Sequence, residues 1–179
     1  MVRELLDWVK TIAIALVLVF LIKYFLLGNY QVDGSSMEPN FHDGERIIVN
    51  KVIYDIRDPK RGEVVVLHSP DGRDFIKRII ALPNEEIEVR GDEVYIDGSL
   101  IEEPYLAEVI KEAAAKGIPY NDRDQPNVKV PEDSYFVLGD NRSDSTDSRM
   151  IGTVAKDDIV GRADLIYWPL SEMELLPWE

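Results

Sequence analysis

The chain has 179 residues, a length typical of one compact domain with a small appendage. Acidic residues outnumber basic residues by 34 to 20, and the formal net charge of −14 argues against a protein that grips nucleic-acid phosphates. The absence of cysteine excludes disulfides, cysteine-based metal sites and a thiol nucleophile. With only two histidines, a multi-histidine metal centre is also disfavoured.

An apolar segment near the N-terminus predicts a membrane anchor. The stretch Leu5–Leu27 would span about 34 Å as a helix, against a bilayer core of about 30 Å. Lys10 and Lys23 lie inside it, but lysine side chains can reach the lipid head groups. A cleaved signal peptide is the first alternative, but no small-x-small cleavage site follows directly. A buried core helix is the second, and the flanking aromatic residues favour a membrane interface instead. The charge bias leans only slightly towards a cytoplasmic N-terminus.

After the anchor, short β-rich stretches separated by turn signals predict a mostly antiparallel β domain. The predicted strands are Arg46–Tyr54, Glu63–His68, Asp74–Leu82, Glu86–Arg90, Ser134–Leu138 and Ile159–Trp168. Leu106–Lys116 has the composition of a short helix that Gly117 and Pro119 end, and a surface loop is expected over Tyr120–Asn127. We therefore expect a cytoplasmic tip and anchor over residues 1–29 and one domain over residues 30–179, with a smaller inserted region at about 91–130.

Ser36 lies in a short segment, Gly34–Pro39, that could present a nucleophile. A serine between a glycine and a turn-forming proline can lie on exposed, irregular backbone with free N–H groups nearby. Taken alone, a simple turn that leaves the membrane explains this segment equally well. Met37 is expected to pack in a core or at the membrane surface.

Lys77 lies in a predicted strand among apolar residues. Alternation puts it on the same face as Phe75 and Ile79, where burial would lower its pKa and allow it to act as a general base. The alternative is an edge lysine whose stem packs while its ammonium group reaches water. Because Ile76 and Ile80 make the opposite face apolar too, the pattern does not choose between them.

A polar loop, Gly139–Arg149, follows the strongly apolar strand before it. An acidic calcium loop is excluded because its aspartates do not have the spacing of an EF-hand. A dense hydrogen-bonding loop remains, in which Asp147 and Arg149 can pair and the serines can orient a neighbour. His42 and His68 could each serve as the base of a serine triad, but both are expected to be surface or turn residues.

Taken together, these segments resemble the type I signal peptidases, membrane-bound serine–lysine proteases that remove signal peptides from exported proteins. The matching segments, in the family's order, are Gly34–Pro39, Arg46–Lys51, Arg61–Val66, Phe75–Pro83 and Gly139–Arg149. A single anchor before the serine resembles the shorter enzymes of Gram-positive bacteria. The resemblance implies the antiparallel β catalytic domain of that family, with one N-terminal transmembrane helix and a short accessory helix.

The resemblance also implies roles for individual residues. Ser36 would be the nucleophile, its backbone N–H an oxyanion donor, and Lys77 the general base. Ser145 would hydrogen-bond the lysine, and Asp147 and Arg149 would form a supporting ion pair. Some relatives carry a serine in place of Gly34 as a second oxyanion donor, so here backbone or water must supply it. The family's Asp-Asn before Ser145 is replaced by Ser143-Asp144.

The implied substrates are secretory preproteins whose signal peptides end in small-x-small motifs such as Ala-x-Ala. The implied enzyme is a monomer in the cell membrane, crosses the bilayer once, and needs no cofactor or metal. Its N-terminus is cytoplasmic and its catalytic domain extracellular. A repressor-type serine–lysine protease is disfavoured because no basic DNA-binding module is present. A non-catalytic anchored binding domain would be expected to lack Ser36 or Lys77, and a plain structural anchor leaves the ordered motifs unexplained.

Overall fold

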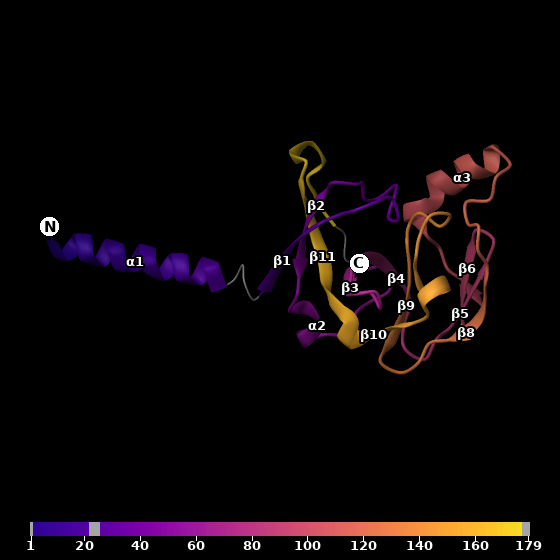
Figure 1. Ribbon diagram of the computed structural model, residues 1–179, viewed down its shortest axis with the longest axis horizontal. Helices are drawn as coiled ribbons and strands as arrows, with labels where there is room; N and C mark the ends of the chain where they lie inside the picture. The colour runs from indigo at the N-terminus through magenta and orange to yellow at the C-terminus, as the bar shows by residue number, and fades with distance from the viewer. Residues whose placement is uncertain (1, 22–25, 177–179) are drawn as a thin grey trace.

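The computed structural model describes residues 2–21 and 26–176, which form two antiparallel β-sheets and several short helices (Figure 1). The larger sheet has the strand order β1-β2-β11-β3-β4-β9-β10, and β12 pairs with β11. Its strands are β1 (Leu27–Gln31), β2 (Arg46–Asn50), β3 (Val64–His68), β4 (Asp74–Ala81), β9 (Ser134–Leu138), β10 (Val154–Ala155), β11 (Ile159–Trp168) and β12 (Glu174–Leu175).

The smaller sheet lies at the far end of the molecule from α1 and has the order β7-β6-β5-β8 (Figure 1). Its strands are β5 (Glu86–Arg90), β6 (Glu93–Ile96), β7 (Ser99–Leu100) and β8 (Gln125–Lys129). Between β7 and β8 the chain forms the 3₁₀ turn η2 (Pro104–Leu106) and the helix α3 (Ala107–Ala115). The remaining helical segments are α1 (Val2–Leu21), α2 (Ile53–Ile56), α4 (Ser148–Ile151), η3 (Lys156–Asp158) and η4 (Leu170–Glu172).

The predicted antiparallel β architecture is confirmed, with two local corrections. The strand predicted over Arg46–Tyr54 ends at Asn50, and Tyr54 turns into the core within α2, where its hydroxyl donates to Glu63 Oε2 at 3.1 Å. Part of the loop predicted over Tyr120–Asn127 is strand β8, because Gln125 pairs with Val89 and so completes the smaller sheet. In both places tertiary contacts override local composition.

Apolar side chains pack on both faces of the larger sheet. One cluster includes Val32, Met37, Phe41 and Val66, and a second on the other side of β3 includes Val65. A third cluster joins the end of β4 to the smaller sheet. Because β4 contacts all three clusters, its side chains from Lys77 to Ala81 are buried or half-buried on both faces of the sheet.

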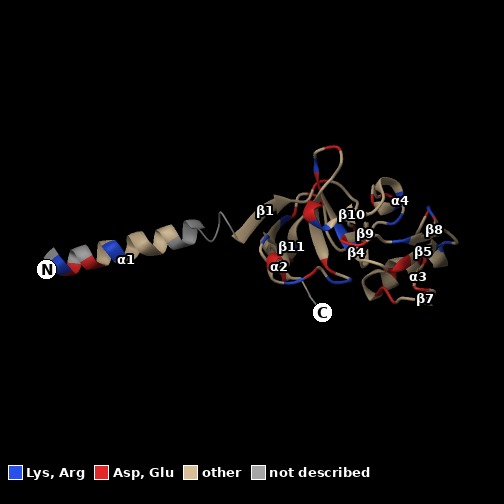
Figure 2. Ribbon diagram, turned by 90° about the horizontal axis from the view of Figure 1, so that it is seen from below, with Lys and Arg blue, Asp and Glu red and all other residues tan. Residues whose placement is uncertain are grey.

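Helix α1 stands apart from the sheets in Figure 1. Its Lys, Arg, Asp and Glu residues lie in its N-terminal half (Figure 2), and exposed apolar side chains such as Ile14 and Leu16 follow. In residues 2–21 and 26–176, no helix has both the length and the apolar character needed to cross a membrane. Residues 22–25 of the predicted anchor lie outside the described residues.

Candidate active site

The turn that carries Ser36 is held from both ends. Before the serine, Gly34 has a φ of +88°, and its N–H donates to Asp43 Oδ1 at 2.8 Å. After the serine, Met37 and Phe41 are fully buried in the core of the larger sheet. Met37 therefore packs in the core, one of its two predicted environments. This arrangement fixes the backbone on either side of Ser36.

Lys77 reaches Ser36 from the neighbouring strand β4. Its Nζ lies 2.8 Å from Ser36 Oγ and 2.7 Å from the carbonyl oxygen of Ile76. The residue is only 3% exposed, since the apolar clusters enclose β4. Of the two sequence interpretations of Lys77, the buried lysine is the one that the structure shows.

Burial controls the charge of this lysine. Removal of the ammonium group from water lowers the pKa of Lys77 from 10.5 to about 8, although the nearby Asp147 and Asp140 carboxylates partly oppose the shift. An amine with a pKa near 8 is deprotonated in an appreciable fraction of molecules at neutral pH. It can then accept a proton from the hydroxyl 2.8 Å away.

The polar loop Gly139–Arg149 packs directly behind the serine. The Asn141 N–H donates to the carbonyl oxygen of Ser36 at 3.1 Å, and the Gly139 N–H donates to Asp147 Oδ2 at 3.0 Å. Arg149 binds both oxygens of Asp147, at 2.9 and 2.7 Å, as the predicted ion pair requires. Burial alone would raise the pKa of Asp147, but the hydrogen bonds from Arg149 and Gly139 lower it further than burial raises it.

Ser145 was expected to hydrogen-bond the lysine. Its Oγ is buried, and it makes no hydrogen bond of normal geometry with any residue in the described part of the chain. The hydroxyl lies near enough to the Asp147 carboxylate to help lower the pKa of that acid. In this structure Ser145 therefore lies behind Gly139 and is not joined to Lys77 by a hydrogen bond.

A cleft of about 290 Å³ opens over the Ser36–Lys77 pair. One wall is residues 30–36, and the other is residues 73–77 of the β3–β4 hairpin. Strand β9 pairs with β4 only from Arg78 onwards, so the backbone edge of β4 before Arg78 faces the cleft. Ile47, Val66 and Ile76 make its floor partly apolar.

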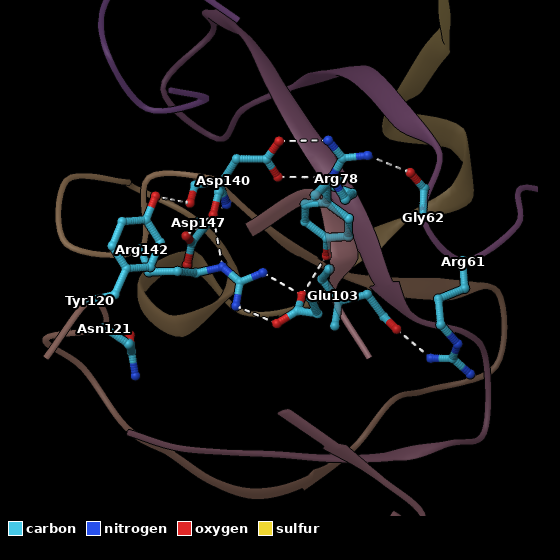
Figure 3. Close-up of polar contacts among 12 residues, drawn as sticks. Arg61, Gly62, Arg78, Glu103, Tyr120, Asn121, Asp140, Arg142 and Asp147 are labelled. Atoms are coloured by element: carbon cyan, nitrogen blue, oxygen red, sulfur yellow. Dashed lines mark hydrogen bonds and ion pairs between the residues drawn. The ribbon is translucent and has the colours of Figure 1, made fainter. Parts of the chain in front are cut away.

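Sequence reasoning missed two buried ion pairs beside this site. Arg78, the residue after Lys77, binds both carboxylate oxygens of Asp140, at 2.8 and 2.6 Å (Figure 3). Arg142 binds both oxygens of Glu103, which lies just before η2 (Figure 3). Charged residues on strands and loops are usually solvated, so only the position of Asp140 and Arg142 inside the recognised loop hinted at these contacts.

The two histidines lie on the surface. His42 is exposed, and His68 Nδ1 lies 2.7 Å from Asp74 Oδ1 in the β3–β4 hairpin. Neither histidine is hydrogen-bonded to Ser36 within the described residues. The polar partner of the serine hydroxyl is Lys77.

A serine hydroxyl bonded to a buried lysine beneath a peptide-sized cleft is the arrangement of a serine–lysine hydrolase. Comparison with known proteins agrees: the family described as signal peptidase, peptidase S26, matches residues 5–168, and the chain belongs to this family. Family membership, expected from the order of the motifs, is thus confirmed.

The relatives cover almost the whole chain. Signal peptidase I of Bacillus amyloliquefaciens is 46% identical over 169 residues, which are 94% of this chain and 90% of that protein. Signal peptidase IB of Staphylococcus aureus is 37% identical over 97% of this chain and 95% of its own length. A crystal structure of a signal peptidase I from Enterococcus faecalis is 38% identical with a TM-score of 0.53, and it covers 58% of this chain and 95% of that one.

Proposed function

We propose that the protein is a type I signal peptidase, a serine endopeptidase that removes signal peptides from exported preproteins. The observation that carries this proposal is the 2.8 Å contact between Ser36 Oγ and the buried Lys77 Nζ at the floor of the cleft. The family, and relatives that bear the name signal peptidase I, support the same activity.

In the first step, neutral Lys77 takes the proton of Ser36 as Oγ attacks the scissile carbonyl carbon. The Ser36 backbone N–H makes no hydrogen bond to another described residue, so it is available to stabilise the resulting oxyanion. The C–N bond then breaks, and the Lys77 ammonium group gives its proton to the leaving amine. Water, deprotonated by Lys77, then attacks the acyl-enzyme ester. The bond between the carbonyl carbon and Ser36 Oγ breaks, Lys77 returns the proton to Oγ, and the signal peptide leaves with a new carboxyl end.

The second oxyanion donor comes from backbone or water. Gly34 has no side chain to donate, and the Ser35 hydroxyl already donates to Asp144 Oδ2 at 2.6 Å. Asp147 and Arg149 keep the loop packed behind Ser36, and Ser145 fills the space beside Gly139. These three residues act as supports and exchange no proton with the substrate.

The substrate is an extended peptide whose side chains beside the cut are small. The open edge of β4 before Arg78 can form main-chain hydrogen bonds with such a peptide, as in other strand-addition complexes. The cleft is about 290 Å³ and partly apolar, and we infer that the side chains it takes beside the cut are small and apolar, such as alanine. Secretory preproteins that end in Ala-x-Ala before the cut meet both requirements.

The anchor over residues 5–27 remains part of the proposal. Apolar side chains of α1 such as Ile12, Ile14 and Val17 are more than half exposed, which a helix tolerates when lipid covers it. We infer one crossing, with a cytoplasmic N-terminus, an extracellular catalytic domain and a monomeric enzyme at the bilayer surface. The chain has no cysteine, so single cysteines can report this topology.

A cleavage assay tests the activity. Detergent-purified wild type, Ser36→Ala and Lys77→Ala are incubated with a precursor that ends in Ala-x-Ala, with Ser171→Ala and Lys156→Ala as surface controls. We expect wild type and both controls to cut directly after the motif, and the two site variants to lose activity by at least about 100-fold. Folded wild type that does not cut would support the non-catalytic binding domain instead.

A labelling assay tests the topology. Glu4→Cys and Glu132→Cys are treated with a membrane-impermeant maleimide in intact spheroplasts and again after lysis. We expect Glu132→Cys to react in both cases and Glu4→Cys only after lysis. Labelling of both residues in intact cells would contradict the cytoplasmic N-terminus.

A further inference from the structure

The segment Glu103–Leu106, which includes η2, contacts all three parts of the chain that form the active site. The Tyr105 carbonyl oxygen accepts from Asn40 Nδ2 at 3.3 Å, four residues after Ser36. The Tyr105 ring lies under the guanidinium of Arg78, whose Cζ is 3.9 Å from the ring centroid. Glu103 binds Arg142 of the polar loop. This segment belongs to the excursion between β7 and β8, to which neither the motifs nor the mechanism assign a role.

The Glu103–Arg142 pair is almost completely enclosed. The two side chains are 6% and 2% exposed, and Arg142 binds both oxygens of the carboxylate (Figure 3). Burial disfavours the charged form of Arg142, but the hydrogen bonds that it donates to Glu103 outweigh this effect and raise the pKa of the guanidinium. A buried ion pair contributes little net stability compared with apolar side chains, so the pair is better explained by the geometry that it imposes.

Two successive contacts connect Arg142 to Ser36. The Arg142 Nε donates to the carbonyl oxygen of Gly139 at 3.1 Å, and Arg149 Nη1 donates to the carbonyl oxygen of Arg142 at 2.8 Å. Gly139 in turn packs against Ser36, since a β-carbon at Gly139 would lie 2.4 Å from the Ser36 carbonyl oxygen. The guanidinium that Glu103 orients therefore sets the position of the backbone on which the serine rests.

We propose that Glu103 is a positioning residue for signal-peptide cleavage, which acts through Arg142 to hold the polar loop against Ser36. The inference rests on the proposed function of the Ser36–Lys77 pair. It assigns to the excursion between the sheets a part in the geometry of catalysis. Glu103 itself contacts neither the serine nor the lysine.

The test compares the kinetics of Glu103→Gln with two controls. Glu102→Gln removes the neighbouring exposed carboxylate. Glu85→Gln breaks the Arg61–Glu85 ion pair, which joins the turn before β3 to the turn before β5 and lies outside the polar loop. For Glu103→Gln we expect kcat to fall about 10-fold to 100-fold while KM stays within about twofold, because a displaced loop misplaces the nucleophile and leaves the cleft unchanged. Both controls should keep the wild-type kcat.

A double-mutant cycle with Arg142→Gln identifies the route. If Glu103 acts through Arg142, the kcat of the double variant is no lower than that of the worse single variant. Tyr105→Phe, which loses only the hydroxyl bonded to Glu103, serves if Glu103→Gln does not fold; about a threefold loss of kcat at unchanged KM is expected. The proposal would be overturned by an unchanged kcat in folded Glu103→Gln or by an equal loss of kcat in Glu85→Gln. It would also be overturned if the losses of kcat in Glu103→Gln and Arg142→Gln multiplied in the double variant. Failure of wild type to cut would refute the proposed function instead.

Discussion

Gly139 lies so close to Ser36 that the active site has no room for a side chain at this position. A β-carbon there would come within 2.4 Å of the Ser36 carbonyl oxygen and 2.2 Å of Ser145 Oγ. Such distances are far below normal van der Waals contact, so the polar loop would have to move. The backbone of the loop and that of the nucleophile therefore form one packed unit.

Gly139→Ala should accordingly lower kcat by about 100-fold, because a shift of about 1 Å at the serine is enough for such a loss. Gly161→Ala is the matched control, since its β-carbon would meet the Asn50 carbonyl oxygen at 2.3 Å, in the β2–β11 ladder. We expect both variants to unfold at a lower temperature than wild type in calorimetry. Only Gly139→Ala should lose much more kcat than its loss of stability explains. Equal losses would mean that the contact matters only for stability.

The pH dependence of cleavage should report the charge of Lys77. Its pKa is lowered to about 8 by burial, so the neutral base is scarce below this pH and abundant above it. We expect log kcat to rise with a slope of one up to about pH 8 and then to level off, as measured by initial rates from pH 6 to 10. A profile without a transition between pH 7 and 9 would be inconsistent with Lys77 as the base.

Lys77→Arg separates the charge of this residue from its proton chemistry. The guanidinium keeps a positive charge but does not deprotonate in proteins, so it cannot accept the Ser36 proton. We expect a loss of at least about 100-fold in kcat at every pH, with no recovery at high pH. Activity that returns above pH 8 in this variant would point to a different base.

Gly34→Ser tests whether the chain can accept a side-chain hydroxyl as a second oxyanion donor. A β-carbon at Gly34 meets no atom within 4 Å, but the backbone there has a φ of +88°, which disfavours a residue with a side chain. We expect a destabilisation of about 1 kcal/mol in denaturant unfolding and no gain in kcat. A rise in kcat would show instead that the added hydroxyl reaches the oxyanion.

Asp147 should contribute to stability in a pH-dependent way. Burial would raise the pKa of this acid, but Arg149 and Gly139 lower it below its usual 3.8. A depressed acid pKa stabilises the folded state above pH 3.8, and this contribution is lost as the pH falls through the folded pKa. Wild type should therefore lose more unfolding free energy below about pH 4 than Asp147→Asn does. If the unfolding free energies of wild type and Asp147→Asn fell in parallel with decreasing pH, Asp147 would not contribute to the loss of stability in acid.

The sequence predicted the parts of this site that local patterns encode. The order of the motifs around Ser36, Lys77 and the polar loop was enough to predict the family, and the alternation of apolar residues was enough to place most strands. The burial of Lys77 could not be predicted, because both faces of its strand are apolar and only tertiary packing encloses them.

Contacts between distant segments were also beyond the sequence. Glu103 lies 39 residues before Arg142 in a stretch with no motif, and no local rule pairs them. Residues 125–127 of β8 fall in the predicted loop Tyr120–Asn127, because these residues become a strand only through pairing with β5. In each case the information lies in the packing of separate elements, which a single sequence does not display.

Lys77 can act as a base near neutral pH only as long as water is excluded from its side chain. Water that enters between β4 and the Ser36 turn would restore the ordinary affinity of this amine for a proton, and a protonated lysine leaves Ser36 inert. Local opening of the cleft floor would thus switch off the peptidase while the two sheets stay folded. On heating, the loss of activity should therefore begin at a lower temperature than global unfolding. A molecule whose cleft floor has opened would be inactive, and it would not cleave other proteins indiscriminately.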